Sequence, residues 1–156
     1  KDNKTQDCIE IGSCRGDTTY ILSQLFNSVI SYERSNENLI DAKNLNKDNN
    51  NVTFIQSDVY SDNFELPDNI QVAFLDAGHT AEHLRYDIER VVKKYGDIIL
   101  IFDDFGQQDK VLRNCIKKAQ DDNLLSIDRY IGQNAGFVTA NDKKFITAEG
   151  VICNLK

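Results

Sequence analysis

The stretch EIGSCRGDT at residues 10–18 decides the fold. A short apolar run at residues 7–11 leads into it and predicts a β-strand, and an amphipathic stretch at residues 18–26 follows it and predicts a helix. Gly12 and Gly16 let the backbone turn tightly between the two elements and let a ligand approach closely. The sequence therefore predicts a strand, a glycine-containing turn and a helix, although the turn lacks the middle glycine of GxGxxG.

Strands and helices alternate along the rest of the chain. Asp17 is the expected N-cap of the first helix, and residues 137–146 are a less regular stretch. The alternation predicts a doubly wound, Rossmann-like α/β sheet that is mostly parallel with an antiparallel C-terminal strand. The further strands are expected at residues 29–33, 52–56, 72–76, 98–102, 126–132 and 150–155, and the further helices at 36–45, 84–95 and 111–119.

Length and composition predict one globular domain over residues 1–156. Hydrophobic residues make up 40% and charged residues 28%, and no apolar run approaches the length of a membrane helix. The formal net charge of −7 disfavours a nucleic-acid partner. The four cysteines form no CxxC pair, so we expect buried, reduced thiols in a cytoplasmic protein rather than a zinc site.

Acidic residues stand at the ends of nearly all predicted strands, at the edge where doubly wound sheets bind their ligands. Glu33, about twenty residues after the glycine turn, is placed to accept two ribose hydroxyl groups, a device that NAD enzymes also use. If Asp76, Asp103 and Asp104 converge, their charges repel unless one is protonated or a hard cation lies among them. In the alternative reading, one aspartate of the pair caps the next helix. The full set is Glu10, Glu33, Asp58, Asp76, Asp103 and Asp104.

The glycine turn resembles a known motif. EIGSCRG is similar to the ExGxxxG first motif of class I S-adenosylmethionine-dependent methyltransferases. In that pattern, an acid after the second strand holds the ribose and an acid after the third strand holds the adenine amino group. The resemblance implies that S-adenosylmethionine is bound by Glu10, Gly12, Ser13, Gly16, Glu33, Arg34, Asp58, Val59 and Asp76.

The stretch from Asp76 to Asp87 resembles the Asp-x-x-His signature of small-molecule and sugar O-methyltransferases. With Asp103 and Asp104 it is similar to the metal-dependent catechol and sugar enzymes, although the catechol type ends its acidic pair with Asn and the sugar type often begins it with Glu. The resemblance implies that Asp76, Asp103 and Asp104 bind a divalent cation such as Mg²⁺. It also implies catalytic roles for Asp76 and His79, with His79 taking a proton; the alternative for His79 is a purely structural residue.

The implied reaction moves a methyl group from S-adenosylmethionine to a hydroxyl of a small molecule or sugar, without a membrane or nucleic-acid partner. An NAD(P)-binding oxidoreductase would also use Glu33, but the absence of GxGxxG and the position of Asp58 argue against it. A second alternative is a non-catalytic partner domain that keeps the fold and binds the cofactor, with the chemistry lost or supplied by another chain. HTAEH at residues 79–83 also matches the HxxEH zinc-protease signature, which the surrounding α/β pattern disfavours. The oligomeric state is left open.

Overall fold

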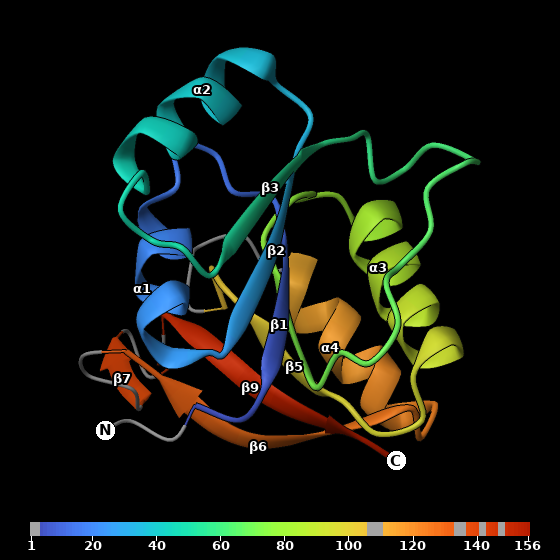
Figure 1. Ribbon diagram of the computed structural model, residues 1–156. Coiled ribbons are helices and arrows are strands. Elements are labelled where there is room, and N and C mark those ends of the chain that lie inside the picture. Colours follow the sequence, from blue (N-terminus) through green and yellow to red (C-terminus); the bar gives the residue numbers. More distant parts are fainter. Residues whose placement is uncertain (1–3, 106–110, 133–136, 141–142, 147–148) are drawn as a thin grey trace. The chain divides into compact units, whose positions relative to one another are not determined.

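The computed structural model describes residues 4–105, 111–132, 137–140, 143–146 and 149–156 (Figure 1). The chain divides into two compact units, Lys1–Ala77 and Gly78–Lys156. Within the described residues, every helix is too short or too polar to cross a bilayer.

The first unit is a parallel α/β unit. Its strands pair in the order β3-β2-β1-β4, and every one of these pairings is parallel. Helices α1 and α2 contact each other and both pack against β2 (Figure 1). In chain order the elements are β1 (Asp7–Ile11), α1 (Asp17–Leu25), β2 (Ser28–Glu33), α2 (Asn36–Leu45), β3 (Val52–Gln56) and β4 (Val72–Leu75).

Burial explains why the central strands of this unit read as apolar runs. Cys8 and Ile9 on β1 have no exposed surface, and all of β4 is buried. Strands covered on both faces need apolar side chains at successive positions rather than alternating ones. Glu10 is therefore an exception, because it is a carboxylic acid with 0% exposure in the middle of this core.

The two helices of the first unit begin in different ways. Ser35 caps α2, and its hydroxyl accepts a hydrogen bond from the backbone N–H of Asn38. The predicted cap of α1 is wrong: Asp17 is the first helical residue, and Gly16 stands at the N-cap with a φ of 88° and no side-chain hydrogen bond. The N-cap position has a left-handed backbone in tight contact with α2, so it requires glycine. The general preference for aspartate at an N-cap does not include these two constraints.

The second unit contains antiparallel strands and two neighbouring helices. Strand β9 lies between β5 and β6 and is antiparallel to both, with a register shift between Ile127 and Arg129. Residues 137–146, which follow no regular pattern in the sequence, contain the paired strands β7 and β8. The elements are α3 (Ala81–Lys94), β5 (Ile99–Phe102), α4 (Val111–Asp121), β6 (Leu125–Ile131), β7 (Phe137–Ala140), β8 (Lys143–Ile146) and β9 (Gly150–Leu155).

The predicted fold class is confirmed. The first unit has parallel strands, with helices connecting β1 to β2 and β2 to β3, and the second has the antiparallel C-terminal strand that was expected. The prediction of a single domain over residues 1–156 stays a prediction.

Candidate functional site

The candidate ligand site of the first unit lies where the strand order changes direction. The chain places β2 and β3 on one side of β1 and then returns to place β4 on the other side. In open α/β sheets, ligands bind outside the carboxyl ends of the strands at such a point. The carboxyl end of β1 leads into the glycine turn at residues 12–16, and β4 ends just before Asp76.

The glycine turn is pressed against the backbone that follows β4. Gly12 has a φ of 94°, and a Cβ atom at this position would lie only 2.5 Å from the carbonyl oxygen of Asp76. The N–H groups of Gly12 and Ser13 both donate to the carbonyl oxygen of Tyr32, at 3.0 and 3.3 Å. The turn is therefore fixed by both neighbouring strands, and a side chain at position 12 would push them apart.

The other end of the turn is fixed by α2. A Cβ atom on Gly16 would lie 2.8 Å from Cα of Ala42. The side-chain amide of Asn46 donates to the carbonyl oxygens of Gly16 and Ala42, at 2.9 and 3.0 Å. The N-terminus of α1, whose backbone N–H groups favour electronegative ligand atoms, is held in place by these contacts.

Glu33 connects the end of β2 to the glycine turn. One carboxylate oxygen accepts the backbone N–H of Cys14 at 2.9 Å, and the other accepts the backbone N–H of Ser35 at 2.7 Å. Each carboxylate oxygen has a second lone pair that remains for a ligand hydroxyl. The geometry thus orients the carboxylate that the sequence assigned to a ribose.

Glu10 is held inside the unit rather than at its surface. The hydroxyl groups of Thr19 and Ser31 donate to its Oε2 at 2.5 and 2.6 Å. Among the described residues, its Oε1 is buried without a hydrogen-bond partner. Burial raises the pKa of Glu10 from 4.5 to about 7, against the opposing effect of the two hydroxyl groups.

The remaining predicted cofactor residues differ in their burial. Ser13 is 4% exposed, and within the described part of the chain its hydroxyl oxygen has no partner. Asp58 is exposed and its Oδ1 accepts the N–H of Tyr60 at 3.0 Å, whereas the neighbouring Val59 is buried. Arg34 is exposed. The tight turn and the two buried polar atoms without partners, on Glu10 and Ser13, fit a ligand that brings its own polar groups, as S-adenosylmethionine does.

The second unit holds the predicted catalytic histidine. His79 lies two residues before α3, and its Nδ1 is 3.7 Å from Oδ2 of Asp104. Asp104 has a φ of 58°, and its N–H donates to Oδ1 of Asp103 at 2.9 Å. Asp76 belongs to the first unit, so the complete metal set of Asp76, Asp103 and Asp104 stays a prediction.

The zinc-protease reading of residues 79–83 fails on the position of the helix. Thr80 is the N-cap of α3, and its hydroxyl accepts the N–H of His83 at 3.2 Å. His79 therefore precedes the helix and cannot share a helical face with His83, as two zinc ligands four residues apart on a helix would.

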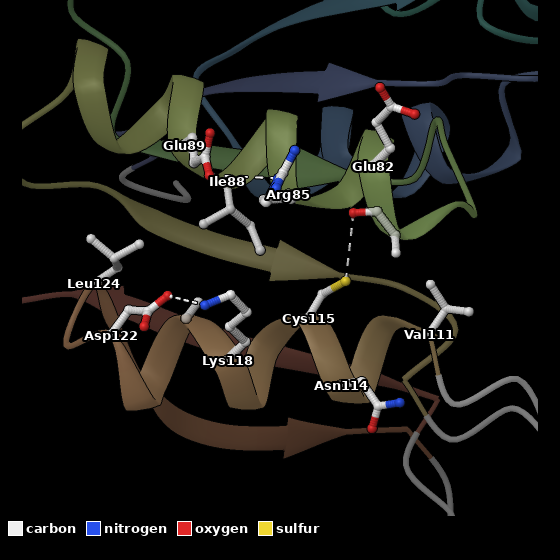
Figure 2. A pocket seen from close by; sticks show the side chains of 12 residues that line it. Glu82, Arg85, Ile88, Glu89, Val111, Asn114, Cys115, Lys118, Asp122 and Leu124 are labelled. Atoms are coloured by element: carbon white, nitrogen blue, oxygen red, sulfur yellow. Dashed lines mark hydrogen bonds and ion pairs between the residues drawn. The ribbon is translucent and has the colours of Figure 1, made fainter.

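A groove of about 570 Å³ lies between α3 and α4 (Figure 2), and no motif in the sequence indicates it. Cys115 lies in it and its thiol donates to the carbonyl oxygen of Ala81 over 3.8 Å. Ion pairs Arg85–Glu89 and Lys118–Asp122 border it, and Glu82 adds one further negative charge. The amphipathic patterns of the sequence predict both helices. They do not predict which residues of α3 face which residues of α4 across the groove. The lining residues are Ala81, Glu82, Arg85, Ile88, Glu89, Val111, Asn114, Cys115, Lys118, Ala119, Asp122 and Leu124.

Comparisons with known proteins agree with this geometry at the level of the fold. No protein-family profile and no curated protein sequence matches the chain. Solved structures do match it, and the matches have the fold of class I S-adenosylmethionine-dependent methyltransferases. At identities of 15–16%, this likeness defines the fold of the chain.

Three of these structures illustrate the likeness. A candidate methyltransferase from Streptococcus mutans in complex with S-adenosylhomocysteine has a TM-score of 0.68 and 16% identity, over 98% of this chain and 90% of that one. An S-adenosylmethionine-dependent O-methyltransferase from Thermotoga maritima has a TM-score of 0.69 and 15% identity, over 98% and 60%. A precorrin-6y C5,15-methyltransferase from Geobacter metallireducens has a TM-score of 0.66 and 16% identity, over 98% and 81%.

Proposed function

We propose that the chain is an S-adenosylmethionine-dependent methyltransferase that acts on a hydroxyl group of a small molecule or sugar. The observation that carries the proposal is the glycine turn at the switch point of the first unit, with Glu33 oriented by two backbone N–H groups. The methyltransferase fold of the matched structures supports the same cofactor. An NAD(P)-binding oxidoreductase and a non-catalytic partner domain are the alternatives that the experiments below distinguish.

Different residues of the first unit would bind different parts of the cofactor. Glu33 would accept the ribose hydroxyl groups, because its carboxylate is already oriented and has lone pairs to spare. Asp58 and Val59 would hold the adenine, and the turn from Gly12 to Gly16 would hold the methionine part. When bound, S-adenosylmethionine supplies a methyl group activated by a positively charged sulfur. Arg34, which is exposed, would contact the cofactor only at its edge.

His79 would take the proton of the acceptor hydroxyl. Its side chain is 66% exposed, so an acceptor can reach it, and Asp104 faces its Nδ1 at 3.7 Å. With Nδ1 facing Asp104, Nε2 is the ring nitrogen that would take the proton. Asp76 completes the proposed catalytic pair, as the sequence motif implies.

We also propose that Asp76, Asp103 and Asp104 bind a divalent cation when the enzyme works. Carboxylate oxygens are the ligands that Mg²⁺ prefers. A chelator should then slow methyl transfer, and added Mg²⁺ should restore it in the wild type but not in Asp103→Asn. Equal rates with and without the chelator would remove the cation from the proposal.

The acceptor is proposed to be a small molecule rather than a nucleic acid. The net charge of −7 opposes binding to a phosphate backbone. The test is a screen of hydroxylated small molecules and sugars in which the formation of S-adenosylhomocysteine is measured.

His79→Gln should reduce kcat by about a hundredfold without changing the affinity for S-adenosylhomocysteine. A variant with unchanged kcat would remove His79 from the mechanism.

A further inference from the structure

The first unit contains a buried carboxylic acid that takes no part in the proposed methyl-transfer step. Glu10 lies at the carboxyl end of β1, two residues before Gly12, and has 0% exposure. Its Oε2 accepts hydroxyl groups from Thr19 on α1 and from Ser31 on β2. The carboxyl group therefore joins the strand, the helix and the neighbouring strand that together shape the glycine turn.

The hydrogen bonds to Glu10 stabilise the ionised form of its carboxyl group, but only at one of the two oxygens. Two donors at 2.5 and 2.6 Å stabilise a negative charge on Oε2. The other oxygen is buried with no donor from the described residues, so the charge is only half compensated. A positive charge outside the carboxyl end of β1 would supply the missing compensation, since a buried carboxylate is weakly screened.

The neighbouring groups make the charge on Glu10 sensitive to pH. Burial is the largest cause that raises its pKa to about 7, and the negative charges of Asp76 on the β4 side and Glu33 on β2 add to it. Cys8, on the same strand, has its own pKa raised to about 12 by burial and by Glu10. Of the two side chains, Glu10 is the one whose pKa lies in the neutral range.

We propose that Glu10 determines the preference of the site for the positively charged methyl donor over its neutral product. The inference rests on the proposed function, since it assumes that S-adenosylmethionine binds over the glycine turn. The donor and S-adenosylhomocysteine differ by one methyl group and one positive charge on sulfur. The ratio of their dissociation constants therefore cancels the contacts that the two ligands share, and its change with pH reports the effect of a nearby negative charge on the sulfur.

The test is calorimetric titration of both ligands into the full chain between pH 5.5 and 8.5. As pH rises through about 7, Glu10 becomes ionised, so the preference for the donor should increase several-fold in the wild type. Glu10→Gln keeps the shape and an acceptor for the two hydroxyl groups but cannot ionise, so its ratio should not change with pH. A ratio independent of pH in the wild type, or the same pH dependence in Glu10→Gln, would overturn the inference.

A second variant, Ser31→Ala, tests the inference independently of whether Glu10→Gln folds. Ser31→Ala removes one donor to Oε2, which disfavours the ionised form and should move the midpoint of the ratio curve to higher pH. An unmoved midpoint would contradict the role of Glu10. If neither ligand binds at any pH, the proposed function itself fails; if both bind with a constant ratio, only this inference fails.

Discussion

Gly12 is the residue whose identity the site depends on most. A methyl group at position 12 would lie 2.5 Å from the carbonyl oxygen of Asp76 and 2.8 Å from Cα of Ala77, both backbone atoms that cannot rotate away. Its positive φ adds strain for any other residue. The glycine is therefore required both by the backbone conformation and by the packing.

Gly12→Ala should reduce the free energy of unfolding by about 1–3 kcal/mol and weaken the binding of S-adenosylhomocysteine at least tenfold. Denaturant unfolding and calorimetry measure the two effects. Gly96→Ala is the matched control, because a Cβ atom at Gly96 would meet nothing within 4 Å. Equal stability and affinity for the two variants would contradict the close packing of the turn.

The four thiols lie in different environments, which corrects the expectation that all are buried. Cys8 and Cys153 are buried, Cys115 is half-buried in the groove between α3 and α4, and Cys14 is exposed in the glycine turn. Cys14 has a φ of 46°, and its N–H is bound to Glu33. Sequence periodicity cannot reveal the exposure of a residue in a turn, because the turn has no regular face.

Cys14 should be the thiol that reacts first with iodoacetamide in the native protein. Burial raises the pKa of Cys8 and Cys153 to about 12, so both should react only after unfolding. S-adenosylhomocysteine should slow the labelling of Cys14 if it covers the turn. Mass spectrometry of peptides from the labelled protein measures each rate, and fastest labelling at Cys8 or Cys153 would contradict the structure.

At the scale of the elements, the sequence predicted most of what the structure contains. Helix α2 has the predicted bounds, and β1, β3 and β9 do as well, because each is a periodic or apolar run between polar turns. The antiparallel pairing of β7 with β8 was not predicted, since it depends on contacts between strands rather than on a local pattern.

The site was predictable in part for the same reason. Strand ends can be located from the sequence, so Glu33 could be assigned a position at the ligand edge before its contacts were known. The hydroxyl groups that hold Glu10 could not be found in this way. Thr19 and Ser31 are separated from Glu10 by nine and twenty-one residues and carry no motif.

For the whole molecule, the buried Glu10 makes stability depend on pH. Its pKa is raised in the folded state from 4.5 to about 7, so its contribution is fully present below pH 4.5 and is lost as pH rises through 7. The free energy of unfolding should fall by up to about 3 kcal/mol over this window. Denaturant unfolding at several pH values measures it, and Glu10→Gln should remove this decrease. A decrease that persists in the variant would assign it to other groups.

The central claim is that the first unit binds S-adenosylmethionine, and calorimetric titration with S-adenosylhomocysteine against an NAD⁺ control tests it most directly. The account predicts micromolar binding of S-adenosylhomocysteine and none of NAD⁺. Glu33→Gln should weaken the binding by about ten- to a hundredfold, whereas Glu37→Gln, an exposed glutamate in the first turn of α2, should leave it unchanged. Binding of NAD⁺ alone, or of neither ligand, would contradict the claim.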